Sequence, residues 1–388
     1  MKRIKIAPRD NWQKRLEDAG CFYHTLNDET YWVEDAAYVF TSAEIDAIDD
    51  ATAELNAMAI SHVVDTITKG DYQGYDFKPE VIETIERSWK SGHLSVYQRY
   101  DLGYDGTHIK MFECNADTPT MLVEPSIWQW HALEDRGWPD QFNSIHEKLI
   151  EWWRTIRSTS DDAAHVHFTA MKDAGPEDWA TSNYLLETAS EAGISCSSLA
   201  IEDIGWHDYQ RGDGVGIFVD ARDKPIKTVS KLYPWEWLLQ DQYGWQAMKA
   251  ETVFIEPAWK LLLSSKACLP LLWDKHKWHP NLLPAYFTES ATPNHEGEWA
   301  VKPRLGREGS NTRKVRQGVV LETGEHNPHY DKYGYIRQRW MPVPTFDGYT
   351  PIIGSWVIGD QTAGIGIRED KAKITSNKSR FVPHYFEG

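Results

Sequence analysis

The stretch Val96-Tyr97-Gln98-Arg99-Tyr100-Asp101-Leu102-Gly103-Tyr104 is followed, after Asp105-Gly106, by Lys110-Met111-Phe112-Glu113-Cys114-Asn115. Side chains of different character alternate along both segments, which predicts two strands of a hairpin. In the first strand Arg99 and Asp101 share one face. In the second strand Glu113 and Asn115 share one face. The pairing of the two strands decides whether these four polar groups meet.

Two registers are open for this hairpin. A two-residue turn at Asp105-Gly106 pairs Asp101 with Lys110 and sends Glu113 to the opposite face. An odd loop or a bulge instead places Arg99 roughly opposite Glu113, and all the polar groups then share one face.

The apolar residues favour the odd register. It places Tyr97 roughly opposite Asn115 and gives the other face an apolar composition, made of Tyr100, Leu102, Phe112 and Cys114. A face that packs on a core should be apolar. We therefore predict the odd register, with the carboxylates of Asp101 and Glu113 on one side of the sheet.

Oxygen donors from Asp101, Glu113 and Asn115 beside the Arg99 guanidinium would form a hard-cation site next to an anion clamp. Magnesium that carries phosphate groups needs this combination. The alternative is a solvated face of an edge strand with an ordinary ion pair. The segment that follows, Ala116-Asp117-Thr118-Pro119-Thr120, adds hydroxyl groups in a turn set by proline.

Further along the chain, Trp299-Ala300-Val301-Lys302-Pro303-Arg304-Leu305-Gly306-Arg307-Glu308-Gly309-Ser310-Asn311 predicts a strand that delivers Lys302 into a basic loop with glycines. Backbone N–H groups of such a loop can approach phosphate oxygens, with Lys302 and Arg307 supplying charge. The spacing does not match a P-loop, and a plain surface hairpin is the alternative. Lys266 lies in an apolar helical stretch, where a lysine usually extends its ammonium group to solvent.

Two more segments have both a functional and a structural interpretation. The strand Tyr335-Ile336-Arg337-Gln338-Arg339-Trp340 ends before Pro342 and either follows an adenine edge or is an edge strand. Arg368 stands at the end of the strand 364–370 and faces either phosphate or solvent.

Composition limits the partners. The chain has 388 residues, 41 Lys plus Arg against 58 Asp plus Glu, and a formal charge of −17. This balance argues against nucleic acid and against an anionic membrane, because both require a basic surface. The four cysteines are far apart, and no apolar run is long enough to span a membrane. We therefore expect a cytoplasmic protein. The 19 tryptophans also suit a carbohydrate enzyme.

The order of patterns predicts an α+β or mixed α/β fold. Thr41-Ser42-Ala43-Glu44 is a capping box that opens a helix over residues 41–69. Within a single unit over residues 1–388 we expect a metal-binding hairpin at 95–123, an α/β substrate lobe at 163–235 and a nucleotide lobe at 260–342.

Together these motifs resemble the synthetase domain of glutathionylspermidine synthase. The likeness rests on Arg99-x-Asp101 and Glu113-x-Asn115-Ala116-Asp117-Thr118-Pro119-Thr120, and it extends over residues 10–386. It includes Lys231-Leu232-Tyr233-Pro234-Trp235-Glu236, Glu256-Pro257-x-Trp259-Lys260, Val301-Lys302-Pro303, Arg307-Glu308-Gly309 and Gly364-Ile365-Gly366-Ile367-Arg368-Glu369-Asp370. The nearest likeness is to stand-alone bacterial acid–amine ligases of this family. The resemblance implies an ATP-grasp-like fold of permuted order, in which the metal-binding strands precede the nucleotide lysines, as they do here.

The resemblance also implies roles. Asp101, Glu113 and Asn115 would hold Mg²⁺, and the catalytic arginines would be Arg99, Arg307 and Arg368. ATP would be bound by Lys266, Lys302, Gly309, Arg337, Gln338, Arg339 and Trp340. Thr118 and Thr120 would face a thiol-tripeptide, and Glu177-Asp178 would receive a polyamine, although acids at a helix start also favour the helix dipole.

The sequence thus predicts an ATP- and Mg²⁺-dependent ligase that joins a peptide-like carboxylate, such as glutathione, to an amine, such as a polyamine, through an acyl phosphate. Two rival functions remain open. A catalytically silent nucleotide- or polyamine-binding protein would bind ATP without releasing phosphate. A carbohydrate-active enzyme would work without ATP and would leave Lys302 and the glycine loop unexplained.

Overall fold

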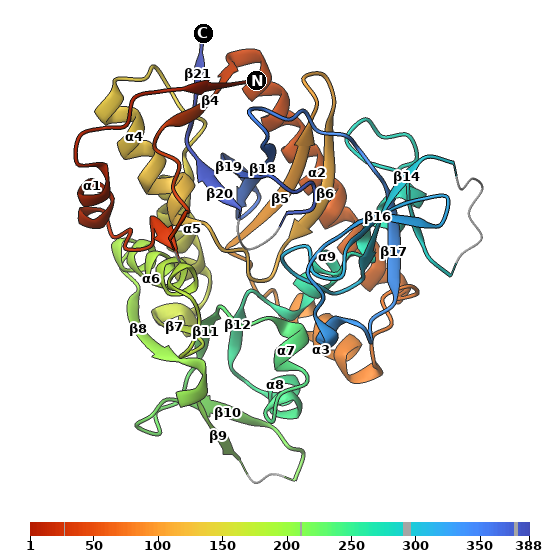
Figure 1. The fold of residues 1–388 in the computed structure, drawn as a ribbon. Coiled ribbons are helices and arrows are strands. Elements are labelled where there is room, and N and C mark those ends of the chain that lie inside the picture. Colours follow the sequence, from red (N-terminus) through yellow and green to blue (C-terminus); the bar gives the residue numbers. More distant parts are fainter. Residues whose placement is uncertain (27, 210–211, 290–295, 376–378) are drawn as a thin grey trace.

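The computed structural model describes residues 1–26, 28–209, 212–289, 296–375 and 379–388. Its centre is an antiparallel sheet of five strands in the order β20-β19-β18-β5-β6. The strands are β5 (Tyr97–Tyr104), β6 (Ile109–Asn115), β18 (Thr350–Ile358), β19 (Gln361–Asp370) and β20 (Arg380–Val382). Strands from the first third of the chain thus pair with strands from its last tenth, as Figure 1 shows.

The long helix α2 (Ser42–Lys69) packs on one face of this sheet. The predicted capping box is confirmed, because the Thr41 side chain accepts from the Glu44 N–H and the Glu44 side chain accepts from the Thr41 N–H. Helix α2 ends at Gly70, whose φ of 63° suits a glycine. Its apolar residues share one core with the inner face of the sheet, which includes Tyr100 and Leu102.

The other face of the central sheet is covered by η1 (Glu124–Trp128) and α5 (Ile145–Thr159). These elements form a second core together with Trp356 and Ile358 of β18. Since both faces of β18 are buried, this strand reads as a nearly continuous apolar run rather than as an alternation. The short helix α4 (Gln129–Arg136) continues directly from η1.

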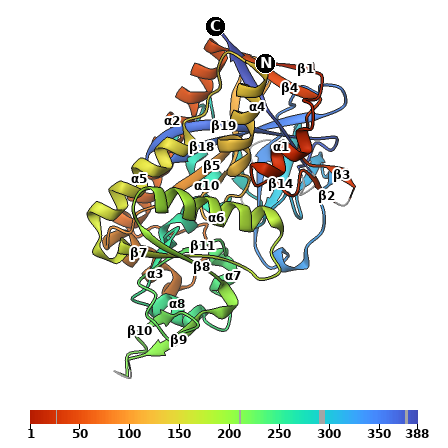
Figure 2. The same ribbon diagram turned by 90° about the vertical axis from the view of Figure 1, so that its left-hand side faces the viewer.

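A second lobe carries a four-stranded parallel sheet in the order β12-β11-β7-β8, made of β7 (His165–Ala170), β8 (Ser195–Ala200), β11 (Thr228–Lys231) and β12 (Val253–Ile255). Helix α6 (Pro176–Glu191) lies across β7 and β8, as Figure 2 shows. The lobe also contains η2 (Asp161–Ala164), η3 (Ile201–Asp203), β9 (Gly205–Asp208), β10 (Gly216–Val219), α7 (Trp235–Leu238) and α8 (Gly244–Lys249). Strand β12 lies beyond the range 163–235, so the parallel sheet extends further along the chain than that range.

A third sheet is antiparallel, with the order β13-β17-β14-β15-β16. Its strands are β13 (Ala285–Phe287), β14 (Glu298–Pro303), β15 (Arg313–Arg316), β16 (Val319–Thr323) and β17 (Tyr335–Arg339), with η5 (Pro328–Tyr330) before β17. Before it in the chain lie η4 (Ala258–Lys260), α9 (Leu261–Ser264) and α10 (Cys268–Lys275), and α10 packs on β13 and β17. Helix α3 (Pro79–Lys90) packs on η4. The mixed α/β class is confirmed. Among the described residues, no helix is long and apolar enough to cross a membrane.

The two ends of the chain meet in a small sheet of order β1-β4-β21, made of β1 (Lys2–Lys5), β4 (Ala36–Thr41) and β21 (His384–Glu387). Strand β21 runs parallel to β4 and β1 runs antiparallel to it. The N-terminal segment also contains α1 (Trp12–Asp18), β2 (Thr25–Leu26) and β3 (Glu29–Thr30). Figure 1 shows both termini at the same end of the molecule.

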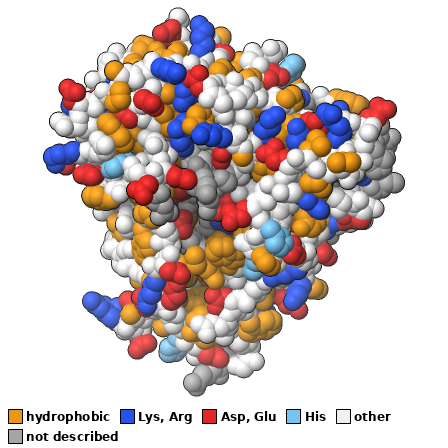
Figure 3. Space-filling view, viewed as in Figure 1, with side chains coloured by type: hydrophobic (Ala, Val, Ile, Leu, Met, Phe, Trp, Pro, Cys, Tyr) orange, Lys and Arg blue, Asp and Glu red, His pale blue; other side chains and the backbone are white. Residues whose placement is uncertain are grey.

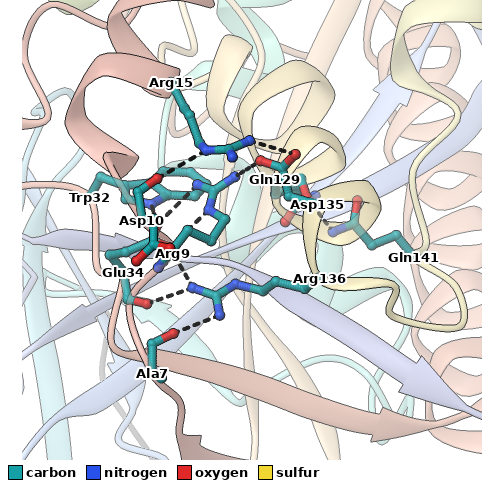
Figure 4. Close-up of polar contacts among 10 residues, drawn as sticks. All are labelled: Ala7, Arg9, Asp10, Arg15, Trp32, Glu34, Gln129, Asp135, Arg136 and Gln141. Atoms are coloured by element: carbon teal, nitrogen blue, oxygen red, sulfur yellow. Dashed lines mark hydrogen bonds and ion pairs between the residues drawn. The ribbon is translucent and has the colours of Figure 1, made fainter.

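A buried carboxylate fastens the N-terminal segment to helix α4 (Figure 4). Glu34 accepts from Arg9 Nε at 2.8 Å and from the Trp32 indole N–H at 2.8 Å, and it also pairs with Arg136. Asp135 bridges Arg9 and Arg15 at 2.8 and 3.0 Å. Burial alone would raise the pKa of Glu34, but the Arg9 guanidinium outweighs burial and lowers that pKa.

Candidate active site

The β5–β6 hairpin has a bulged register. Arg99 lies opposite Asn115 and Asp101 lies opposite Glu113, and the register shifts between Asp101 and Leu102. The predicted shared face of Asp101 and Glu113 is therefore confirmed, and so is the bulge. The predicted partners were wrong by two residues, since Arg99 faces Asn115 rather than Glu113, and Tyr97 does not face Asn115.

The bulge also corrects the composition of the two faces. Met111 pairs with Leu102 and belongs to the core, whereas Phe112 was expected there. Phe112 instead lines a cavity on the polar side of the hairpin. The hairpin brings its ring over Gly103, where a Cβ atom would lie 2.3 Å from Phe112 Cζ. Only a glycine at position 103 leaves room for this ring.

The cavity, of about 330 Å³, lies between this hairpin and the third sheet. Seven of the predicted site residues line it: Asp101, Glu113, Lys302, Gly309, Gln338, Arg339 and Trp340. Its remaining walls are mostly apolar, and include Phe112, Ala300, Met341, Ile352 and Ile374. Figure 3 shows Lys and Arg side chains close to Asp and Glu side chains over the central part of the face that it draws. A chamber with apolar walls and several charged side chains suits a ligand that has a flat apolar part and an anionic part.

Asp101 stands at the centre of an ion-pair network. Its Oδ1 accepts from Arg99 Nε at 2.7 Å, and its Oδ2 accepts from Arg368 at 2.6 Å and from the Asn115 amide at 3.2 Å. Arg99 also donates to the backbone oxygen of Thr120 at 2.7 Å. Burial would lower the pKa of Arg99, but the charge and hydrogen bond of Asp101, together with the charges of Glu113 and Glu177, outweigh burial and raise that pKa. Arg99 therefore stays charged beside Asp101.

Glu113 lies near Lys266 and Lys302, the two lysines predicted to bind the nucleotide. Lys266 Nζ lies 3.1 Å from Glu113 Oε2 and also donates to the backbone oxygen of Gly306 at 2.7 Å. Burial would raise the pKa of Glu113, but Lys266 and Lys302 outweigh it and lower the pKa to about 2. Burial lowers the pKa of Lys302 to about 8, although Glu113 opposes this shift.

Lys302 is fixed by the strands around it. Its ammonium group donates to the backbone oxygen of Phe112 at 3.0 Å and to Gln338 Oε1 at 2.9 Å. Gln338 in turn donates to the backbone oxygen of Met111 at 3.0 Å. Side chains alternate along β17, so Arg337 and Arg339 point to the opposite face of the sheet from Gln338. The Arg339 guanidinium stacks over Trp299 at 5.4 Å there, and Arg337 is not among the cavity-lining residues.

The predicted glycine loop folds back over the hairpin. Arg307 pairs with the Thr118 hydroxyl, and its Nε lies 3.5 Å from Glu236 Oε1. Gly309 has a φ of 67°, and a Cβ atom at this position would lie 2.2 Å from the backbone oxygen of Thr375. The loop therefore reaches the cavity through a close backbone contact that only glycine permits.

A buried ion pair positions the segment that follows the hairpin. Asp117 Oδ1 lies 2.6 Å from Lys231 Nζ, and Asp117 Oδ2 accepts from the Trp235 N–H at 2.7 Å. Both side chains are almost fully buried. This pair joins the central sheet to the parallel sheet, and it holds the neighbouring Thr118 and Thr120 between them.

Glu177 and Asp178 lie in the first turn of α6, after Gly175. Burial raises the pKa of Glu177, helped by the charge of Asp178 and opposed by a hydrogen bond with the Thr120 side chain and by Arg368. Burial also raises the pKa of Asp178, against the charge of Arg307. The two acids therefore lie beside the arginines of the site rather than on a free surface.

The structure adds residues that the sequence analysis did not select. Glu298, Lys314 and Lys373 line the cavity. Lys314 Nζ lies 2.8 Å from Glu298 Oε2 and 4.6 Å from the centre of the Trp340 ring. Lys314 lies opposite Ala300 in the β14–β15 pair. This pairing would have placed Lys314 at the site, but it could not be derived from the sequence without knowing which strands pair.

The donors around the cavity fit magnesium. Asp101, Glu113 and Asn115 offer carboxylate and amide oxygens from two directly paired strands, which are the ligands that a hard cation prefers. Among the described ranges, no group of three or more His, Cys, Asp or Glu residues could hold a metal ion. A magnesium ion here would thus share its ligands with a phosphate-bearing ligand, as Mg²⁺ commonly does in nucleotide sites.

The architecture is that of glutathione synthetase-like proteins. A glutathione synthetase-like effector from Globodera pallida superposes with a TM-score of 0.53 at 10% identity, over 90% of this chain and 89% of that chain. The chain belongs to the glutathionylspermidine synthase preATP-grasp family, which matches residues 3–387.

Relatives agree with this family. The Haemophilus influenzae protein named "Putative acid--amine ligase" is 44% identical over the whole of both chains. Trypanothione synthetase of Crithidia fasciculata is 29% identical over 78% of this chain and 49% of that protein. The bifunctional glutathionylspermidine synthetase/amidase of Escherichia coli is 23% identical over 89% of this chain and 58% of that protein. The chain thus spans about half the length of the last two relatives. The predicted enzyme class, a ligase that forms carbon–nitrogen bonds, is confirmed.

Proposed function

We propose that the protein is an ATP- and Mg²⁺-dependent ligase that forms an amide bond between a peptide-like carboxylate and an amine through an acyl phosphate. Glutathione and a polyamine are the model substrates, and an ATP-grasp fold of permuted order is part of the proposal. The observation that carries it is the cavity whose lining combines Asp101, Glu113 and Lys302 with apolar side chains. A carbohydrate-active enzyme would leave this arrangement without a role, whereas a silent nucleotide-binding protein would use it and is distinguished from the ligase by phosphate release.

The nucleotide would lie along the cavity, with its base toward Trp340 and its phosphates toward Lys302 and the loop at Gly309. Lys266, Lys302 and the cavity-lining Lys373 supply three positive charges for the phosphates. Arg337 and Arg339 belong to the same strand, and their contribution to the nucleotide would be limited to the backbone. Asp101, Glu113 and Asn115 would hold the magnesium ion, which neutralises phosphate charge when it is bound.

The carboxylate substrate would attack the γ-phosphoryl group and take it over, with ADP leaving. This step needs positioning and charge neutralisation rather than covalent protein chemistry. Arg99 and Arg368 approach Asp101 from two strands and are aimed at the place where the transferring group would sit. Arg307, held at Thr118, would complete the set from the loop side.

The amine would then attack the acyl carbon, and phosphate would leave. Acyl phosphates react with water, so the site must exclude it during this step. The loop over residues 303–311 is in position to do this, because it bridges Thr118 and the 374–375 segment. Glu177 and Asp178 would attract the ammonium form of the amine, and Thr118 and Thr120 would face the acid.

Phosphate release from MgATP across pairs of small peptides and polyamines, with the products read by mass, tests the proposal. We expect amide product in the wild type and loss of turnover in Asp101→Asn. The matched control is Asp105→Asn in the turn of the same hairpin, where the side chain accepts from the Thr107 and His108 N–H groups and lies 3.1 Å from the His108 imidazole. ATP binding without phosphate release from any pair would favour the silent binding protein. Sugar hydrolysis without ATP would favour the carbohydrate enzyme.

A further inference from the structure

One wall of the cavity is held by a glutamate that stands behind it. The connection between β19 and β20 contributes Lys373, Ile374 and Thr375 to the lining of the cavity. Glu322 belongs to β16, the edge strand of the third sheet. Its Oε1 accepts from the Lys373 N–H at 3.0 Å and from the Ile374 N–H at 3.4 Å. This carboxylate therefore ties the connection of the central sheet to the edge of the third sheet.

A second carboxylate closes the base of the same connection. Asp370 is the last residue of β19. Its Oδ1 accepts from the Ala372 N–H at 3.0 Å, and its Oδ2 accepts from the Ser379 hydroxyl at 3.1 Å. Asp370 thus fixes the two ends of the connection, whereas Glu322 fixes the part that lines the cavity.

Two glycines let this part of the connection pack closely against the third sheet. A Cβ atom at Gly309 would lie 3.0 Å from Ile374 Cγ2, and a Cβ atom at Gly324 would lie 3.3 Å from the same atom. A Cβ atom at Gly324 would also lie 2.3 Å from the backbone oxygen of Gly309, which itself lines the cavity. The wall is a close stack of three segments, residues 309–312, 322–325 and 373–375.

The position of this wall matters for the affinity of a ligand in the cavity. A segment that has to be ordered when a ligand binds subtracts its ordering cost from the binding free energy. Hydrogen bonds from N–H groups to a carboxylate are stronger than those to a neutral oxygen, so Glu322 can hold the segment before the ligand arrives. Glu322 itself is not among the residues that line the cavity. Its effect on a ligand would therefore pass through residues 373–375.

We propose that Glu322 is a positioning residue for the nucleotide, because it holds the backbone of residues 373–375 in place as a wall of the cavity. This inference rests on the proposed function, in which ATP occupies the cavity. Through this wall, Glu322 sets the places at which Lys373 and Ile374 meet the nucleotide.

The test separates the loss of this contact from a general loss of stability. Glu322→Ala removes the acceptor, whereas Glu322→Gln keeps a side-chain oxygen that can accept from the same N–H groups. The matched control is Glu325→Ala, which truncates an exposed acid three residues further along and keeps the backbone oxygen that accepts from the Asn311 N–H. Isothermal titration calorimetry measures the binding of MgATP. Steady-state kinetics use an acid–amine pair that gives product in the wild type.

We expect the Kd for MgATP to be about 10-fold higher in Glu322→Ala and within about threefold of the wild type in Glu322→Gln. Glu325→Ala should bind as the wild type does. The KM for ATP should rise in Glu322→Ala while kcat at saturating ATP stays within a few-fold, because Glu322 touches no reacting group. Lys373→Ala should also weaken binding. The double variant should bind about as weakly as Glu322→Ala alone, because Lys373 contributes only while its backbone is held.

Amide hydrogen exchange of a peptide that contains residues 373–375 gives a second measurement. Without nucleotide, this peptide should be protected in the wild type and should exchange faster in Glu322→Ala. Saturating MgATP should restore the protection. Peptides from α2 should exchange at the same rate in both proteins, which would exclude a loss of overall stability as the cause.

Three results with the variants would overturn the inference: an ATP affinity of Glu322→Ala within twofold of the wild type, additive losses in the double variant, or a loss of kcat at an unchanged KM for ATP. Rapid exchange of the 373–375 peptide in the wild type without nucleotide would contradict the tie without any variant. A wild type that binds no ATP would instead overturn the proposed function. If the wild type binds ATP but converts no acid–amine pair, the ligase proposal fails, and calorimetry and hydrogen exchange still decide the inference.

Discussion

Replacing Lys302 by alanine isolates the contribution of one buried charge to nucleotide binding. The Lys302 ammonium group is held by the Phe112 backbone oxygen and by Gln338 at about hydrogen-bond length, and it lines the cavity. A charge-assisted hydrogen bond contributes about 1.5–3 kcal/mol. Losing one to a phosphate group corresponds to about a 10- to 150-fold weaker Kd for ATP.

The burial of Lys302 also determines how the affinity for ATP changes with pH. Burial lowers the pKa of Lys302 to about 8, so without nucleotide the side chain loses its charge as the pH rises through that value. ATP requires the charged form. We therefore expect ATP affinity of the wild type to fall above about pH 8, and the affinity of Lys302→Ala to change much less over the same range.

Isothermal titration calorimetry with MgATP between pH 7 and about 9.5 measures both effects. The matched control is Lys14→Ala, whose side chain is 73% exposed and pairs with Asp18 on the surface. An ATP affinity of Lys302→Ala within twofold of the wild type, or a wild type whose affinity does not fall above pH 8, would refute the assignment of Lys302 to the phosphates.

Three further predictions concern stability and the loop. Asp117→Asn removes the counter-charge of the buried Lys231 ammonium group, and urea unfolding should show a loss of about 3–5 kcal/mol. Asp18→Asn, which breaks an exposed pair, should cost under about 1 kcal/mol. Gly309→Ala adds a Cβ that would lie 2.2 Å from the Thr375 oxygen, so phosphate release should fall. Gly318→Ala has a similar positive φ but open space around it, and equal losses in both variants would show that backbone strain alone is responsible. Glu34→Gln removes the partner of Arg9 and Arg136 and should lower the melting temperature at pH 7. Because the pKa of Glu34 is lowered in the folded protein, its stabilisation is present above the unfolded pKa and is lost as the pH falls through the folded value. A melting-temperature difference that stays constant down to pH 3 would contradict this origin.

The sequence predicted the structure correctly where the apolar residues of a strand all fall on the face that packs against the core. One face of the β5–β6 hairpin had to be apolar to pack on α2, and this requirement alone placed Asp101 and Glu113 together. The cross-strand pairs between β5 and β6 depend on a bulge at Phe112. That bulge follows from a contact between the Phe112 ring and Gly103 on the other strand, which periodicity cannot express.

Other residues needed the three-dimensional arrangement. Glu124 stands in the apolar run Met121-Leu122-Val123-Glu124-Pro125, where its neighbours predict only burial. Its carboxyl group is held by hydrogen bonds from Tyr23 and Tyr31, which lie far away in sequence. Likewise, Arg337 was grouped with its neighbours on the strand, although alternation along β17 separates its side chain from that of Gln338.

The β1-β4-β21 sheet brings the two ends of the described chain close together. Lys2 pairs with Val39 on one side of β4, and Glu387 pairs with Thr41 on the other. The two ends are thus separated by two strand spacings, about 10 Å, at one end of a shared strand. A linker of a few residues could join them, and the circular polypeptide could be reopened at an exposed turn such as Asp220–Asp223, between β10 and β11, without breaking the central sheet. Such a circular permutant would move β1 and β21 into the middle of the sequence while keeping every strand pairing, so the linear order of this protein could be rearranged independently of its fold.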